Sequence, residues 1–130
     1  MSKRVVTDTM AIVLRLEQRK LPQQVRNIFL KAEQEECTII IPTMVFAEIG
    51  YLSERGRIDV TLDDVRTYCT QHPNIVESAL TQAIVAHSFT INDIPELHDR
   101  LIAGTASYQQ LPLLTNDPII TQSQHLTVIW

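Results

Sequence analysis

Apolar positions along the chain fall into two kinds of segment, and the two kinds alternate. Short continuous runs rich in β-branched residues predict buried strands, and they lie at residues 5–7, 38–41, 74–77, 113–115 and 127–129. Between these runs the apolar residues recur every three or four positions, as on one face of an amphipathic helix. This period predicts helices at residues 10–19, 22–32, 44–53, 61–70, 80–88 and 96–110.

Local signals mark where several of these helices begin. Pro22 suits a first helical turn, where its missing N–H costs nothing. Thr61 and Asp64 have the spacing of a capping box, in which each side chain binds the backbone N–H of the other residue. Before the helix at 96–110 we expect Asp93 to be the cap and Glu96 its partner in the box.

The alternation of strands and helices predicts an α/β fold. Strands joined through helices of this length pair in parallel by right-handed crossovers, which gives a three-layer domain with a mainly parallel central sheet and helices on both faces. A chain of 130 residues, 45% of them hydrophobic, is long enough for one core, so we expect a single domain over residues 1–130. In such sheets ligands bind at the carboxyl ends of the strands.

Composition indicates the cellular location of the protein and the state of its cysteines. The sequence contains no apolar run near the ~20 residues of a membrane span and no signal peptide, so we expect a cytoplasmic protein with no membrane association. Cys37 and Cys69 lie far apart, and reduced thiols in the core are the expected state.

Charge is distributed unevenly about a net value of −4. Residues 1–66 carry ten bases and ten acids, whereas residues 67–130 carry one base, Arg100, against five acids. All of the excess negative charge therefore lies in the second half. A divalent cation bound there would reverse the local sign and let an acidic pocket accept a phosphate.

Glu33 lies among the acids of a helix end that we expect to be solvated, and it needs no special account. Four other acids occupy positions where carboxylates are unusual. Asp8 and Asp117 each lie just past the end of a predicted buried strand. Glu48 and Asp99 lie on the apolar stripes of their helices, with apolar residues one turn before and after them. Two strand ends and two inward helix faces can place four carboxylates around one crevice.

Each of these acids, taken alone, could equally be a helix cap, a turn former or the partner of a buried arginine. The second half offers only Arg100 as such a partner, and its side chain points roughly 100° away from that of Asp99 around the helix. Protein cations therefore cannot neutralise all four acids. Clustered carboxylates suit hard cations such as Mg²⁺ or Mn²⁺, and the four histidines share no zinc-binding spacing.

Four strings in the sequence carry a resemblance to a known family. They are VTDTMAIV, IPTMVFAEIGYL, PELHDRLIAGTA and LPLLTNDPII, in that order. Their order and spacing resemble the acidic motifs of PIN-domain ribonucleases, especially the VapC-type toxins of prokaryotic toxin–antitoxin pairs. The resemblance covers almost the whole chain.

Carried over residue by residue, the resemblance implies roles for six positions. The metal-binding and catalytic acids would be Asp8, Glu48, Asp99 and Asp117. Thr115 matches a supporting hydroxyl of the family. Asn116 would be a second supporting residue, although many relatives have a small or basic residue there.

The same resemblance implies a Mg²⁺- or Mn²⁺-dependent endoribonuclease. One or two ions held by the carboxylates would activate water for attack on a phosphodiester, and no side-chain nucleophile would be needed. The implied partners are an RNA substrate, a cognate antitoxin protein and a second copy of the chain in a homodimer. The apolar surfaces of the first helices could serve as the dimer face, but a stripe of that kind is usually core. Four arginines are candidates for contacts with the RNA backbone, although a solvated helix surface is the simpler reading: Arg15, Arg55, Arg57 and Arg100.

Other functions fit less of the sequence. A haloacid-dehalogenase-like phosphatase needs a second acid two residues after Asp8, where this chain has Met10, and a receiver-like domain needs a late lysine, although none follows Lys31. The serious alternative is a non-catalytic PIN scaffold or antitoxin-like module that binds a protein or RNA. Inward carboxylates favour the enzyme. They lower the stability of the fold, and a protein that only binds a partner has no need of them.

Overall fold

The computed structural model describes residues 3–130, which form one five-stranded sheet with every strand parallel to its neighbours. The strand order is β3-β2-β1-β4-β5. The strands are β1 (Lys3–Thr7), β2 (Cys37–Pro42), β3 (Ile75–Ser78), β4 (Leu113–Leu114) and β5 (Val128–Ile129). The predicted α/β class and the five predicted strands are therefore confirmed.

Seven helices connect and follow these strands within the described residues. They are α1 (Thr9–Leu16), α2 (Gln23–Glu33), α3 (Thr43–Glu54), α4 (Leu62–Gln71), α5 (Gln82–Ser88), α6 (Leu97–Tyr108) and α7 (Pro118–Thr121). The first six correspond to the helices predicted from the period of apolar residues. The sequence pattern missed α7, a single turn that begins with Pro118 directly after Asp117. Among residues 3–130, no helix is both long and apolar enough to cross a bilayer.

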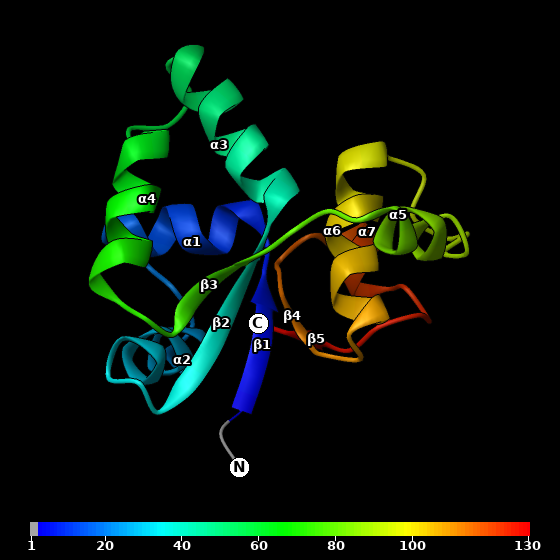
Figure 1. The fold of residues 1–130 in the computed structure, drawn as a ribbon, viewed down its shortest axis with the longest axis horizontal. Helices are drawn as coiled ribbons and strands as arrows, with labels where there is room; N and C mark the ends of the chain where they lie inside the picture. Colours follow the sequence, from blue (N-terminus) through cyan, green and yellow to red (C-terminus); the bar gives the residue numbers. More distant parts are fainter. Residues whose placement is uncertain (1–2) are drawn as a thin grey trace.

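The helices form two layers with the sheet between them, as Figure 1 shows. Helices α1 to α4 lie on one side, and α5, α6 and α7 lie on the other. This division follows from the strand order, because right-handed crossovers that run from β1 to β3 and those that run from β3 to β5 leave the sheet by opposite faces. The predicted three-layer arrangement is confirmed.

The order in which strands are added to the sheet reverses at β1, so β1 and β4 are neighbours that belong to the two halves of the sheet. Successive strands are added on one side of β1 as far as β3, and then on its other side as β4 and β5. Thr7 pairs with Leu114, so the residues that follow β1 and β4 leave the sheet next to each other. A crevice at such a point is the usual ligand site of an open parallel sheet.

The core fills both faces of the central strands. The last three residues of β1, Val5, Val6 and Thr7, are all fully buried, which explains why no charged side chain alternates with them. Helices α1 and α2 contribute their apolar stripes to the same core, including Ile12 and Phe29. Those stripes are therefore core, and they are not available as the dimer face considered from the sequence.

Helices α5 and α6 cross at very close range because Gly104 has no side chain. A Cβ at that position would lie 1.8 Å from the Ser88 hydroxyl oxygen, so only glycine fits without movement of α5.

Two local predictions about acids were wrong. Glu96 itself caps α6. Asp93 instead accepts hydrogen bonds from the Ser123 hydroxyl and the Gln124 N–H, which tie the loop after α7 to the loop before α6. Glu33, expected in a solvated helix end, forms an ion pair with Arg15 at 2.7 Å. The predicted capping box of Thr61 and Asp64 is present.

A candidate active site at the carboxyl edge of the sheet

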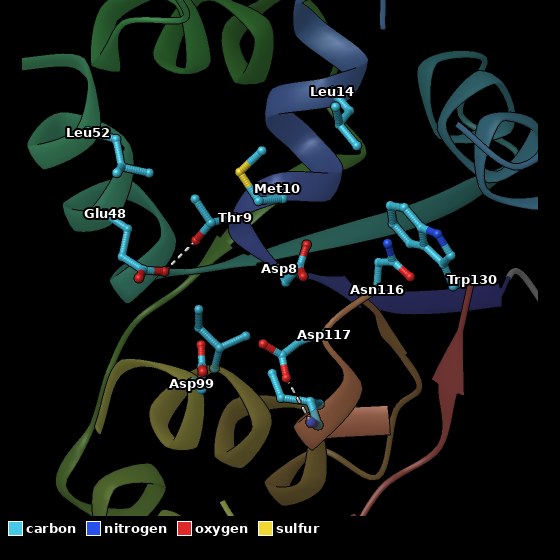
Figure 2. A pocket seen from close by; sticks show the side chains of 12 residues that line it. Asp8, Thr9, Met10, Leu14, Glu48, Leu52, Asp99, Asn116, Asp117 and Trp130 are labelled. Atoms are coloured by element: carbon cyan, nitrogen blue, oxygen red, sulfur yellow. Dashed lines mark hydrogen bonds between the residues drawn. The ribbon is translucent and has the colours of Figure 1, made fainter. Parts of the chain in front are cut away.

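The four acids singled out by sequence line one open pocket of about 410 Å³ at the carboxyl edge of the sheet. Asp8 follows β1, Asp117 lies three residues after β4, and Glu48 and Asp99 project from α3 and α6 on opposite sides of the sheet. Figure 2 shows the four carboxylates around the same space. Each acid is half-buried, so none of the four points away into bulk water.

Asp8 is held in place by the helix that it begins. It is the N-cap of α1, and its Oδ1 accepts the backbone N–H of Ala11 at 2.8 Å. Its own N–H donates to the Leu114 carbonyl, which extends the pairing of β1 and β4 beyond the last paired strand residues. A cap uses one carboxylate oxygen, and the second oxygen remains for another contact.

Asp117 repeats this arrangement at the end of β4. Its Oδ1 accepts the N–H groups of Ile119 and Ile120, so it caps α7. The hydroxyl of Thr115, which is fully buried, accepts the N–H of Asp117 at 3.1 Å and fixes the turn. Asn116 lies between them, is exposed, and also lines the pocket.

Glu48 is oriented from the opposite wall by Thr9. The Thr9 hydroxyl donates to Glu48 Oε1, which joins the start of α1 to the middle of α3. Thr9 is buried and follows Asp8 directly, so one short segment supplies one acid and positions another.

Asp99 lies in the first turn of α6, where its backbone N–H is capped by the Glu96 side chain. Glu96 also hydrogen-bonds His98, and this contact raises the pKa of the histidine. Glu96 and His98 are thus engaged with each other on the outside of the helix, whereas Asp99 turns towards Asp117, as Figure 2 shows.

Burial and mutual repulsion leave two of the acids reluctant to ionise. Burial raises the pKa of Asp8 to about 6 against hydrogen bonds from Thr115 and Ala11 that lower it, and the charges of Glu48 and Asp117 raise it further. Burial likewise raises the pKa of Asp99 to about 6, and the charge of Asp117 raises it more than that of any other acid. Like charges that share a site cannot all ionise cheaply, so the pocket favours a cation.

Protein side chains do not supply that cation. None of the ion pairs formed within residues 3–130 involves Asp8, Glu48, Asp99 or Asp117. The acids also do not form a closed cage, since the part of the chain from residue 3 onwards holds no group of three acids, histidines or cysteines close enough to share an ion. Mg²⁺ commonly keeps several waters and takes only one or two carboxylates directly, so this open set of oxygen donors fits a hydrated hard cation.

The fold is shared with toxin–antitoxin proteins. The structure of VapBC2 from Rickettsia felis, bound to a DNA fragment from its promoter, superposes with a TM-score of 0.74 at 18% identity over 98% of each chain. DNA-bound VapBC from Salmonella typhimurium gives 0.71 at 15% identity, over 99% of this chain and 98% of that one. FitAcB from Neisseria gonorrhoeae gives 0.61 at 15% identity, over 97% and 96%. The chain has a PIN-type fold. The sequence itself matches no family model and no curated protein.

Within this PIN-type fold, the arginines considered for RNA contacts lie away from the acidic pocket. Arg15 is paired with Glu33, Arg55 lies over the Tyr51 ring at 4.4 Å, and Arg100 donates to the Ile94 carbonyl. Arg57 is exposed. None of the four lines the pocket that holds the acids.

Two residues of the PIN-type pocket were missed by sequence reasoning. Thr9 was missed because its partner, Glu48, is 39 positions away and only the folded chain brings them together. Trp130 lies past the last strand and was treated as part of no motif, yet its side chain lines the pocket. The only sequence signal for Trp130 was that it is the single tryptophan of the chain.

Proposed function

We propose that this protein is a ribonuclease that depends on Mg²⁺ or Mn²⁺, with Asp8, Glu48, Asp99 and Asp117 as the metal-binding acids. The observation that supports the proposal most is their common pocket, to which four separate elements each contribute one carboxylate and no base. A divalent ion bound there supplies positive charge that acidifies water and stabilises the charge developing on the phosphate oxygens.

The chain's own residues prepare this chemistry. Thr9 orients Glu48, and the caps of α1 and α7 fix Asp8 and Asp117, so the donors are held before a cation arrives. The raised pKa values of Asp8 and Asp99 mean that full ionisation is coupled to cation binding near neutral pH. RNA would place its scissile phosphate in the same pocket, where a cation held by the carboxylates would offset their repulsion of the phosphate.

The structural neighbours and the four sequence strings support the proposal that the protein is a toxin. Several neighbours are toxin–antitoxin complexes, including one from Klebsiella pneumoniae with a TM-score of 0.65 at 14% identity. By analogy this chain would be the VapC-like toxin, held inactive by a cognate antitoxin and paired as a homodimer. The check is co-purification with the product of a short reading frame next to its gene, followed by light scattering of the separated toxin.

The test of the ribonuclease is cleavage by purified protein freed of any partner. We expect cleavage of RNA in Mg²⁺ or Mn²⁺ and none in EDTA. Asp99→Asn removes a charge with little change of shape, and it should lower cleavage by more than about 100-fold, since even outer-shell partners of metal ligands cost 10–100-fold. Circular dichroism should show an unchanged fold.

A matched control separates chemistry from contamination. Asp63→Asn makes the same chemical change on α4, at a side chain 89% exposed, and should cleave like the wild type. All variants are purified identically, because a contaminating ribonuclease would survive every substitution. If wild type, Asp63→Asn and Asp99→Asn cleave equally, or if none cleaves with either metal, the chain is better described as a non-catalytic binding scaffold.

A further inference from the structure

The acidic pocket has an apolar side that metal binding does not explain. Besides the carboxylates and Asn116, its lining includes the side chains of Met10, Leu14 and Trp130. A bound cation needs oxygen donors and water only. The apolar residues therefore suit another part of the substrate.

Trp130 is fixed beside the acids but remains partly exposed. Its backbone carbonyl accepts a hydrogen bond from the Gln24 side chain on α2, and part of its side chain packs on the core. Figure 2 shows the indole and Asn116 at the end of the pocket away from Glu48. Within residues 3–130, the close ring–ring and guanidinium–ring contacts involve other rings, so no second aromatic ring and no guanidinium stacks on the indole.

Asn116 lines the same end of the pocket as this ring and carries an amide group. Its side chain is exposed and offers both hydrogen-bond donors and an acceptor, whereas its neighbour Asp117 is used in capping α7. An amide of this kind can pair with the edge of a nucleobase, and unpaired RNA bases stack on aromatic side chains.

We propose that Trp130 and Asn116 form a nucleobase pocket, in which a base next to the scissile phosphate stacks on the indole while the Asn116 amide binds its edge. This inference rests on the proposed ribonuclease function and adds the two residues that would hold an unpaired base at the cut site. A base in a duplex is stacked on its neighbours and cannot lie flat on the indole. Trp130 is thus a positioning residue, and Asn116 selects among bases.

The single tryptophan makes the proposal directly measurable. In the Asp99→Asn variant with Mg²⁺, an unstructured ten-nucleotide RNA containing all four bases should quench tryptophan emission as it binds. A blunt RNA duplex of the same sequence should bind with much less quenching. Binding itself is followed separately by the anisotropy of a dye attached to the RNA.

Substitutions in the otherwise wild-type protein test the ring and the amide. Trp130→Leu keeps an apolar side chain without a stacking face and should raise KM roughly 10-fold with a smaller change in kcat, whereas Trp130→Phe should recover most of the loss. Tyr108→Ala removes an exposed aromatic at the far end of α6, outside this pocket, and should leave KM unchanged. Asn116→Ala should flatten the preference among substrates that differ only in the base at the cut site.

The outcomes distinguish the nucleobase pocket from the ribonuclease function on which it rests. If RNA is cleaved but binding leaves the emission of Trp130 unchanged, or Trp130→Leu and Trp130→Phe have equal KM, the nucleobase pocket is wrong and the ribonuclease stands. If no RNA binds or is cleaved, the ribonuclease falls and the nucleobase pocket falls with it.

Discussion

Replacing Asp8 by asparagine should stabilise the metal-free protein near neutral pH. Burial raises the pKa of Asp8 to about 6 from its ordinary value of 3.8. The folded protein therefore holds this proton more tightly than the unfolded chain does. The stability that comes from the protonated carboxyl is present below about pH 4 and is lost as the pH rises through about 6.

The magnitude follows from the size of this shift. A change of about 2 pKa units, at about 1.4 kcal/mol for each unit, amounts to about 3 kcal/mol in the free energy of unfolding as an upper value. Asparagine has the same shape and can still accept the Ala11 N–H as the cap of α1. The Asp8→Asn variant should thus avoid the loss that the wild type suffers at pH 8.

The measurement is urea unfolding in EDTA at several pH values between 4 and 8. The variant should exceed the wild type by about 2–3 kcal/mol at pH 8, and the difference should shrink as the pH falls towards 4. Asp63→Asn, on the exposed surface of α4, should change stability by no more than about 0.5 kcal/mol at either extreme. Adding Mg²⁺ should reverse the order at pH 8, because only the wild type keeps its full ligand set.

The reasoning would be refuted by a variant less stable than the wild type at pH 8 in EDTA. A difference in stability that does not vary with pH would refute it equally, since it would show that ionisation of Asp8 does not lower the free energy of unfolding. Either result would mean that the main task of Asp8 is to cap α1.

Three further substitutions test contacts around the site and in the core. Thr9→Val removes the hydroxyl that orients Glu48 and should weaken metal affinity, measured by calorimetry, roughly 10- to 100-fold, while Thr9→Ser restores it. Tyr68→Phe removes a hydrogen bond to the Glu33 carboxylate and should cost about 2 kcal/mol in urea unfolding, and an effect below about 0.5 kcal/mol would show that the bond contributes nothing. Gly104→Ala would place a methyl group 1.8 Å from the serine hydroxyl on α5 and should lower stability by about 1–3 kcal/mol, which thermal unfolding would contradict if the midpoint did not fall.

Most of the fold could be predicted from the sequence because the local signals agree with one another. The continuous apolar strand at 38–41 and the capping box at Thr61 have strong local causes, and both are found where expected. Helix α7 was missed because a single turn is too short to show a period, although an aspartate followed by Pro118 is a legitimate signal for a helix start.

The four acids could be selected from sequence because each one violates the pattern of its own element. Their shared pocket could not be derived from any one of them, since it depends on β4 pairing with β1 instead of with β3. Glu33 shows the opposite error. It lies among other acids at a helix end, a pattern that predicts a solvated side chain. In the structure Arg15 and Tyr68, from two other helices, donate hydrogen bonds to its carboxylate. Contacts of this kind lie beyond local pattern, as does the contact of Thr9 with Glu48.

The strand order also sets when the pocket can exist during synthesis of the chain. Strands β1, β2 and β3 can pair as soon as residue 78 has emerged, but β1 is then an open edge and the pocket has only Asp8 and Glu48. Asp99 arrives with α6, and Asp117 is placed only when β4 closes onto β1. A growing chain therefore lacks the complete set of acids until β4 and Asp117 have been made. For an enzyme that cuts RNA, this order of assembly would spare the message from which the chain is being translated.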